Sequence, residues 1–187
     1  MITVGAKIQP FKITGVPPGQ TAEFFDITEE SFAGQWKVLV YYPKDFTFVC
    51  PTEIVEYDNL FEEFEKRDAV LLTGSTDNEF CKVAWQSQHP LLKNIRHIQF
   101  ADTARPEYLD KGGWRNNSLI EQLGIFYSEA GAALRATFII DPQNVVQHIT
   151  VNNLNVGRNP AETLRVLDAL QTGELTACSR PIGGATL

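Results

Sequence analysis

Strand-length apolar segments alternate with amphipathic segments of helical period along this chain. Residues 35–42 are rich in β-branched and aromatic side chains and stop before a proline, which predicts a buried central strand. Residues 51–66 begin with a proline and repeat apolar side chains at helical spacing, which predicts an amphipathic helix. Residues 69–73 predict a second strand, and a further helix is expected after Asp77. This order is typical of a sheet whose strands are connected through helices.

The second half of the chain adds a hairpin and a closing helix. Residues 134–140 and 145–151 flank a turn sequence and predict two antiparallel strands. Residues 160–171 predict a helix that begins at a proline, with Asn159 as its cap. The other predicted segments are a short strand over 97–101, a long loop with one helical turn over 103–117, a short helix over 118–123 ended by Gly124, and a mobile tail over 173–187.

These segments predict an α/β protein with a central mixed β-sheet flanked by helices. A βαβ unit followed by a ββα unit is the thioredoxin-like arrangement. The chain has 187 residues, a little more than one domain of roughly 150 residues. We therefore expect one thioredoxin-like domain over residues 1–172 and a C-terminal tail over residues 173–187.

Composition excludes several classes of function. The net charge of −7 disfavours broad electrostatic binding to nucleic acid or to anionic lipid. No apolar run approaches the roughly 18 residues of a membrane-spanning helix, and the first residues lack the features of a secretory signal, so a cytoplasmic protein is expected. The number of cysteines is odd, which argues against a disulfide framework. The cysteines and histidines also lack the spacing of metal ligands; they are Cys50, Cys81, Cys178, His89, His97 and His148.

Cys50 stands immediately before Pro51, where the first predicted helix begins. Unpaired amide hydrogens and the helix dipole at such a position favour a negative charge. We therefore expect the Cys50 thiol to ionise readily, and the thiolate is the nucleophilic form of cysteine. The alternative is a small buried apolar residue, which is the commoner role of a single cysteine. The helix position alone does not decide between the two.

The residues around Cys50 favour the reactive role. Residues 43–53 read Pro-Lys-Asp-Phe-Thr-Phe-Val-Cys-Pro-Thr-Glu and resemble the active-site segment of the peroxiredoxins, in which proline, threonine and cysteine recur at fixed spacing. The resemblance extends over essentially the whole chain and is closest to the alkyl hydroperoxide reductase C type of two-cysteine peroxiredoxin. It implies that Cys50 is the peroxidatic cysteine, that the Thr47 hydroxyl contacts the peroxide, and that Pro43 shields the pocket. Taken alone, Thr47 would be a turn residue and Pro43 would end a strand.

The same resemblance predicts a positively charged side chain beside Cys50. Arg135, at the start of the predicted strand 134–140, matches the active-site arginine of the family. Its guanidinium can stabilise a thiolate and orient peroxide oxygens, although a surface charge at a strand end is the alternative. Glu53 and Arg158 fall on family positions that brace this arginine. Trp85 matches a family aromatic near the pocket, and core packing explains it equally well.

Cys178 lies in the predicted tail and matches the resolving cysteine of the family. The resemblance implies that oxidised Cys50 forms a disulfide with Cys178, usually between two subunits. The sequence around Cys178 departs from the usual Cys-Pro of the family and lacks its following tryptophan, so an incidental surface thiol is the alternative. Cys81 lies inside the helix after Asp77 and is expected to pack there and stay unreactive.

The function implied by the resemblance is a thiol-dependent peroxidase that acts on hydroperoxides and uses neither metal nor cofactor. The expected reductant is an external dithiol: thioredoxin, a flavoprotein reductase or a small CxxC adapter. The expected assembly is a homodimer, joined into a ring. The chain lacks the Gly-Gly-Leu-Gly loop and C-terminal Tyr-Phe helix of oxidation-sensitive members, so resistance to overoxidation is expected. The alternative function is a peroxide-responsive holdase chaperone or redox relay. A disulfide exchanger is disfavoured because no CxxC accompanies Cys50.

Overall fold

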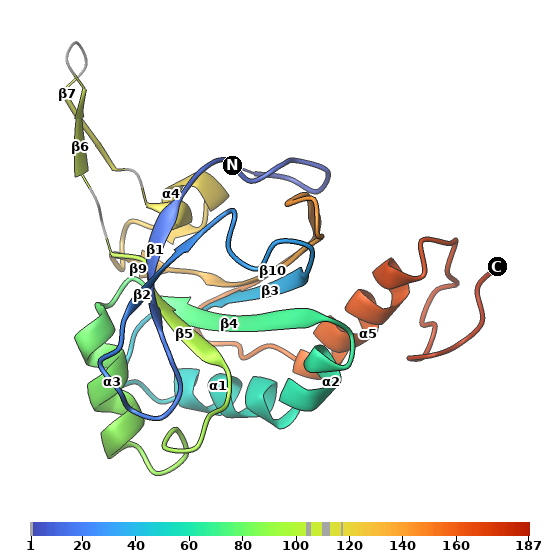
Figure 1. Cartoon of the computed structure of the whole chain (residues 1–187), viewed down its shortest axis with the longest axis horizontal. Coiled ribbons are helices and arrows are strands. Elements are labelled where there is room, and N and C mark those ends of the chain that lie inside the picture. The colour runs from blue at the N-terminus through green and yellow to red at the C-terminus, as the bar shows by residue number, and fades with distance from the viewer. Residues whose placement is uncertain (1, 104–105, 110–112, 117) are drawn as a thin grey trace.

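The computed structural model describes residues 2–103, 106–109, 113–116 and 118–187 and contains one large mixed β-sheet (Figure 1). Its strands are β1 (Lys12–Val16), β2 (Phe25–Thr28), β3 (Trp36–Tyr41), β4 (Ala69–Ser75), β5 (Ile98–Ala101), β10 (Arg135–Ile140) and β11 (Val146–Asn152). They lie in the order β11-β10-β3-β4-β5-β1-β2. The β3–β4 and β4–β5 pairs are parallel and the other pairs are antiparallel. The predicted mixed sheet is confirmed.

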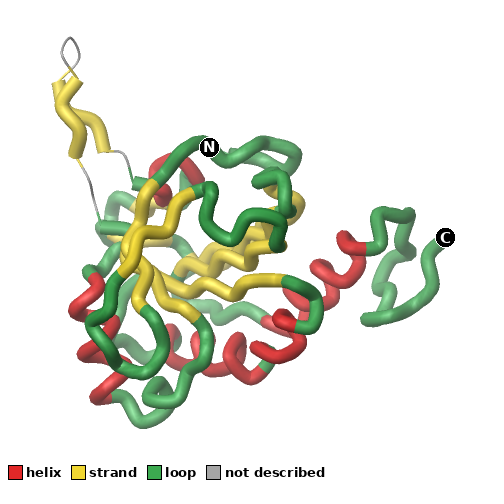
Figure 2. Tube along the Cα trace, viewed as in Figure 1, coloured by secondary structure: helices red, strands yellow, loops and turns green. Residues whose placement is uncertain are grey.

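Helices cover both faces of this sheet (Figure 2). Val38 and Val40 of β3 face a cluster that includes Phe64, Leu164 and Leu167. Leu39 and Tyr41 point to the opposite face, because side chains alternate along a strand, and pack with residues of a short helix near position 120. The helices are α1 (Cys50–Asn59), α2 (Phe61–Glu65), α3 (Glu79–Gln88), α4 (Leu119–Leu123) and α5 (Pro160–Gln171).

Most predicted boundaries agree with the structure within a few residues. The β10–β11 hairpin is antiparallel, as predicted. The predicted cap of α5 is present, since the Asn159 side chain accepts a hydrogen bond from the Ala161 amide at 3.0 Å. Gly124 ends α4 with a positive φ of 71°, a conformation that glycine adopts without a steric penalty.

The prediction of a single helix over residues 51–66 is wrong in its extent. The helix begins one residue earlier, at Cys50, and is interrupted at Leu60, where φ is −100° and ψ is 9°. The Arg96 guanidinium donates to the carbonyl oxygen of Asp58 and also pairs with its side chain. This remote arginine competes for a carbonyl that the next helical turn needs, so the helix is divided into α1 and α2.

The prediction of a long loop with a helical turn over residues 103–117 is also wrong. Two strands, β6 (Pro106–Leu109) and β7 (Gly113–Asn116), pair antiparallel in that segment, with Tyr108 opposite Trp114. Aromatic residues favour strands, and proline is tolerated as the first residue of a strand. Residues 104–105, 110–112 and 117 of the predicted loop lie outside the described residues. A further small sheet pairs β8 (Phe126–Tyr127) with β9 (Ala132–Ala133).

The C-terminal segment, residues 173–187, follows α5 and folds back on itself at one end of the molecule (Figure 1). Its mobility and its separation from a domain over residues 1–172 stay predictions. None of the helices in the described part of the chain is long and apolar enough to cross a membrane.

Candidate active site

Cys50 is the first residue of α1 and is buried, with 1% of its surface exposed. Pro51 fits the first turn of a helix, because the amide hydrogen that proline lacks has no partner there. The helix therefore begins at Cys50. No side chain caps the helix start at Val49. An apolar cluster that includes Tyr42, Ile54 and Trp85 surrounds the sulfur. The thiol therefore lies at the positive end of a helix dipole and is shielded from bulk water.

Arg135 reaches Cys50 from the first position of β10. Its Nη1 lies 3.3 Å from the Cys50 Sγ and 2.8 Å from Oε2 of Glu53. Its Nε donates to the Leu154 carbonyl at 2.6 Å. Only 4% of the residue is exposed, so the alternative of a surface charge is wrong. A guanidinium fixed by two other acceptors offers an oriented hydrogen bond to the sulfur, which stabilises the thiolate.

Glu53 and Arg158 hold this arginine in place. Glu53 Oε1 accepts hydrogen bonds from the backbone amide and Nε of Arg158 at 2.9 and 2.8 Å. Burial raises the pKa of Glu53, but the hydrogen bonds and charge of Arg158, together with the charge of Arg135, lower it more, so the net shift is downward. Two buried cations thus face one carboxylate. A Cys50 thiolate balances the charge of this cluster, whereas a neutral thiol leaves an excess positive charge.

Pro43 and Thr47 lie on the loop that connects β3 to α1. Pro43 is buried, and the partly exposed Thr47 donates its hydroxyl to the Lys44 carbonyl at 3.0 Å. In the described structure no hydrogen bond joins Thr47 to the Cys50 sulfur. The structure therefore joins Cys50 and Glu53 through Arg135, and it places Thr47 three residues before the thiol without a direct bond.

Trp85 of α3 is 1% exposed and belongs to the cluster around Cys50. Its ring lies 6.0 Å from that of Tyr42 and 5.8 Å from that of Phe46, centroid to centroid. Trp85 therefore packs against two aromatic residues of the segment that connects β3 to α1. Its position agrees with proximity to the pocket and with a packing role.

The sequence alone missed a buried ion pair beneath the same loop. Nζ of Lys82 lies 2.9 and 3.0 Å from the two carboxylate oxygens of Asp45 and 2.7 Å from the Ser75 hydroxyl. The Asp45 amide donates to the Asp77 carboxylate at 2.7 Å. The only signal was a lysine on the inward side of the helix after Asp77. These contacts attach the loop to β4 and α3. The Leu154 carbonyl was also missed, because a backbone acceptor leaves no mark in the sequence.

The other two cysteines lie apart from this cluster. Cys178 is exposed in the C-terminal segment, with its sulfur 3.7 Å from the Ser179 hydroxyl. Cys81 is partly buried in α3. All three cysteines are free thiols in this structure. Across the described residues, no three metal-ligating side chains gather in one place.

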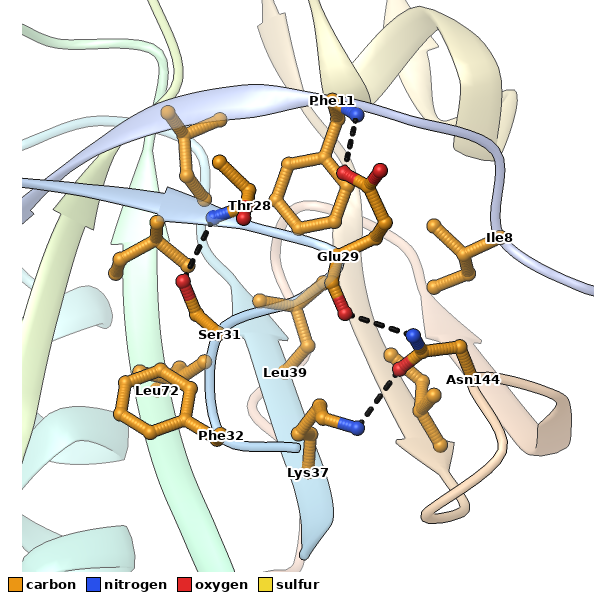
Figure 3. A pocket seen from close by; sticks show the side chains of 13 residues that line it. Ile8, Phe11, Thr28, Glu29, Ser31, Phe32, Lys37, Leu39, Leu72 and Asn144 are labelled. Atoms are coloured by element: carbon orange, nitrogen blue, oxygen red, sulfur yellow. Dashed lines mark hydrogen bonds between the residues drawn. The ribbon is translucent and has the colours of Figure 1, made fainter. Parts of the chain in front are cut away.

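A small apolar pocket lies on the face of the sheet opposite to the one that carries Val38 and Val40 (Figure 3). Its lining includes Ile13 and Leu39, and Leu39 points away from the face that carries Val38 and Val40. Lys37 donates to the Asn144 side chain at 2.8 Å at its edge. The cavity is ≈ 20 Å³, about enough for one water molecule, so it is too small for an organic substrate.

Fold and site together define a thioredoxin-like protein with a buried cysteine at a helix start and an arginine on its sulfur. Residues 4–149 match the family model described as "AhpC/TSA family". Alkyl hydroperoxide reductase C of Mycolicibacterium smegmatis is 38% identical over all of this chain and 94% of the relative. Peroxiredoxin TSA1 of Saccharomyces cerevisiae is 37% identical over 95% of this chain and 86% of its own length.

Solved structures agree with these sequence relatives. AhpC of Mycobacterium tuberculosis superposes with a TM-score of 0.79 at 37% identity, covering 95% of this chain and 97% of that one. The reduced 2-Cys peroxiredoxin of Plasmodium vivax superposes with a TM-score of 0.83 at 30% identity, covering 99% and 92%. The chain belongs to the AhpC/TSA family. It is a thiol-dependent peroxidase with a thioredoxin-like fold, and the holdase alternative is not favoured.

Proposed function

We propose that the chain reduces hydrogen peroxide and organic hydroperoxides with Cys50 as the nucleophile. The Cys50 thiolate attacks one peroxide oxygen, the O–O bond breaks, and the departing oxygen takes a proton to leave as water or an alcohol. Cys50 is left as a sulfenic acid. The observation that carries this proposal is the 3.3 Å contact between Arg135 Nη1 and the buried Cys50 sulfur.

The other site residues have supporting roles in this proposal. Arg135 stabilises the thiolate and then the negative charge that develops on the leaving oxygen. The Thr47 hydroxyl, three residues from the thiol, contacts the bound peroxide after it exchanges its bond to the Lys44 carbonyl. Pro43 and Trp85 shield the pocket from water. Glu53 and Arg158 fix the orientation of Arg135.

Cys178 then resolves the sulfenic acid. Its thiol sulfur attacks the Cys50 sulfur, water leaves, and a Cys50–Cys178 disulfide forms between two subunits. An external dithiol reduces this disulfide by thiol exchange and becomes a disulfide itself. Thioredoxin, a flavoprotein reductase or a CxxC adapter could serve, and a peroxidase assay with each one in turn distinguishes them.

The experiment that tests the catalytic assignment is peroxide consumption with dithiothreitol as reductant. Wild type should turn over, Cys50→Ser should be inactive, and Cys178→Ser should keep a fast first oxidation. Cys81→Ser is the matched control and should behave as wild type. Normal peroxide consumption by Cys50→Ser would refute the assignment.

Non-reducing electrophoresis tests the disulfide. A dimer band should appear with peroxide and be absent from Cys178→Ser. A band that persists in this variant would exclude Cys178 as the partner.

We also propose a homodimer that assembles into a ring. Phe46, Phe48 and Phe80 are 54%, 94% and 64% exposed on the loop before Cys50 and on α3. Phe46 packs on Trp85 of α3, so these exposed aromatic side chains come from two segments that are in contact, and exposed apolar surface of this kind is typical of a contact surface. Light scattering should give a mass well above the 20.9 kDa of one chain, and a monomeric mass would contradict this assembly.

The proposed location is the cytoplasm, because three cysteines without short spacing do not make the disulfide framework that is common in small secreted proteins. Immunoblotting of fractionated cells should find the protein with cytoplasmic markers.

A further inference from the structure

A lysine, a serine and two carboxylates meet beneath the loop that connects β3 to α1. The side chains of Lys82 on α3 and of its partner Asp45 are 0% and 2% exposed. Ser75, the last residue of β4, has its Oγ 3.0 Å from Oδ1 of Asp45 and 3.3 Å from Oδ2 of Asp77. We name Asp45, Ser75, Asp77 and Lys82 the loop anchor. Removing either partner of an ion pair buried this deeply leaves an uncompensated charge, so the pair stays closed in the folded protein.

The loop anchor fixes one peptide group of the loop, the one that joins Lys44 to Asp45. The amide of this peptide group donates to Oδ2 of Asp77 at 2.7 Å. Its carbonyl oxygen, which belongs to Lys44, accepts a hydrogen bond from the Thr47 hydroxyl at 3.0 Å. A peptide group is planar, so the carboxylate that orients its amide also orients its carbonyl oxygen. The position of the Thr47 hydroxyl therefore depends on the loop anchor.

Phe46, between Asp45 and Thr47, adopts a backbone conformation that needs this support. Its φ is 55°, in the left-handed region that bulky side chains rarely adopt. A residue keeps such a conformation only where the surrounding contacts determine it. Here the preceding residue is held by Lys82, and the Phe46 ring lies 5.8 Å from the ring of Trp85, centroid to centroid. We therefore expect the loop to relax to a commoner conformation when the ion pair is removed.

The loop anchor is separate from the contacts that stabilise the thiolate. Arg135 contacts the Cys50 sulfur at 3.3 Å and is held by Glu53. Among the contacts of the described residues, no hydrogen bond or ion pair joins the loop anchor to Arg135 or Glu53. The Lys82 ammonium lies 5.3 Å from the ring centroid of Tyr42, which packs in the same cluster as Cys50. One set of contacts thus holds the thiolate, and the other holds the loop that carries the hydroxyl.

We propose that Lys82 and Asp45 are positioning residues for the peroxidase reaction, which hold the Thr47 hydroxyl where it meets the bound peroxide. The proposal rests on the roles proposed above for Cys50 and Thr47. The hydroxyl exchanges its bond to the Lys44 carbonyl for a bond to a peroxide oxygen. An anchored loop keeps the hydroxyl within reach of that oxygen during the attack. Loss of the loop anchor lowers the rate of attack and leaves the thiolate itself as reactive as before.

A double-mutant cycle with Thr47 tests this role in the full-length protein. Competition for hydrogen peroxide against a reporter thiol measures the rate of Cys50 oxidation. Lys82→Met should slow this oxidation roughly tenfold, because the hydroxyl is no longer held in place. In Thr47→Val the same substitution should change the rate by less than about twofold, since the hydroxyl that it positions is gone. Equal losses in the two backgrounds, or no loss in either, would overturn the proposal.

Asp45→Asn repeats the cycle with a side chain of nearly the same shape, should Lys82→Met fail to fold. Its loss should be smaller, about threefold, because the amide oxygen still accepts from Lys82, and this loss should also disappear in Thr47→Val. Lys37→Met is the matched control, because Lys37 is a buried lysine on β3 that donates to the Asn144 side chain at 2.8 Å. It should oxidise as fast as wild type. A tenfold loss in this control would attribute the effect to the removal of any buried lysine and refute the positioning role.

A second readout separates the loop anchor from the thiolate. Iodoacetamide alkylates a thiolate without needing the Thr47 hydroxyl, and mass spectrometry of the Cys50 peptide follows the rate. Lys82→Met should be alkylated at least as fast as wild type while its oxidation by peroxide is slower. A parallel loss of both rates would show that the loop anchor acts on the thiol, against the proposal. If Thr47→Val alone is oxidised as fast as wild type, the proposed role of Thr47 fails instead, and the positioning role falls with it.

Discussion

At the scale of single residues, Arg135 satisfies three acceptors at once: a sulfur, a carboxylate and a backbone carbonyl. Its planar fork can do so because its nitrogens point in fixed directions. A lysine ammonium at this position cannot reach all three. We expect Arg135→Lys to lower the rate of the first oxidation roughly 100-fold, as loss of one oriented donor does at other anionic centres.

Competition for peroxide against a reporter thiol measures that rate. Arg165→Lys, at a more exposed arginine on α5 paired with Glu162, is the control and should oxidise as fast as wild type. A first-step rate within twofold of wild type in Arg135→Lys would mean that the guanidinium is not required.

The ionisation of Glu53 predicts how the stability of the protein depends on pH. Its pKa lies below the ordinary value of 4.5 because Arg158 and Arg135 outweigh the effect of burial. A carboxyl with a lowered folded pKa stabilises the fold above its unfolded pKa, and this stabilisation is lost as pH falls through the folded value. Unfolding free energies should therefore favour wild type over Glu53→Gln by about 3 kcal/mol near neutral pH, since the substitution leaves buried arginines uncompensated.

Chemical denaturation between pH 7 and pH 3 measures this difference. It should stay constant down to the ordinary carboxyl range and shrink below it. A difference that grows as the solution becomes more acidic would contradict the lowered pKa.

At the scale of elements, local patterns predicted the hairpin of β10 and β11, the capped helix α5 and the start of a helix near Cys50. They could not predict the break at Leu60, because the residue that competes for the Asp58 carbonyl is Arg96, which is remote in the sequence. The β6–β7 pairing was missed because turn-forming residues outweighed the strand-forming aromatics in a short segment.

Gly74 shows how closely two of these elements approach. A Cβ at this position in β4 would lie 2.3 Å from the Phe100 carbonyl oxygen of β5, the residue with which it is in register. The backbone of a central strand cannot move away cheaply. Gly74→Ala should destabilise the protein by about 2 kcal/mol, measured by urea unfolding. Gly157→Ala is the control, since an added Cβ there meets nothing closer than 3.7 Å, and equal stabilities of the two variants would contradict the packing argument.

At the scale of the whole molecule, the site is assembled from segments that are distant in the sequence. Cys50 and Glu53 come from α1, Arg135 from β10, and Arg158 from the connection before α5. The resemblance to the peroxiredoxins, which extends over essentially the whole chain, pointed to each of these residues, but periodicity alone could not have shown that they come together. The contacts that join both arginines to Glu53, and Arg135 to the Cys50 sulfur, became visible only in the fold, because they connect α1, β10 and the segment before α5.

The β6–β7 hairpin projects from this assembly on its own small sheet (Figure 1). Asp102 precedes the hairpin, and its carboxylate accepts hydrogen bonds from the amides of Leu119 and Ile120, which follow the hairpin, at 3.1 and 2.6 Å and from the Tyr41 hydroxyl at 2.8 Å. Replacing residues 104–117 by a short Gly-Ser linker should therefore leave the unfolding free energy within about 1 kcal/mol of wild type, because loop length has a small effect on stability.

Peroxide turnover of this variant should stay within twofold of wild type, because Cys50 lies at the start of α1 on the other side of the sheet from Asp102 and α4. Asp102→Ala supplies the contrast. It removes the acceptor of two amides and a buried hydroxyl and should cost about 2 kcal/mol while the hairpin is still present. If the deletion abolishes turnover and Asp102→Ala does not change stability, the hairpin rather than its base supports the fold and site.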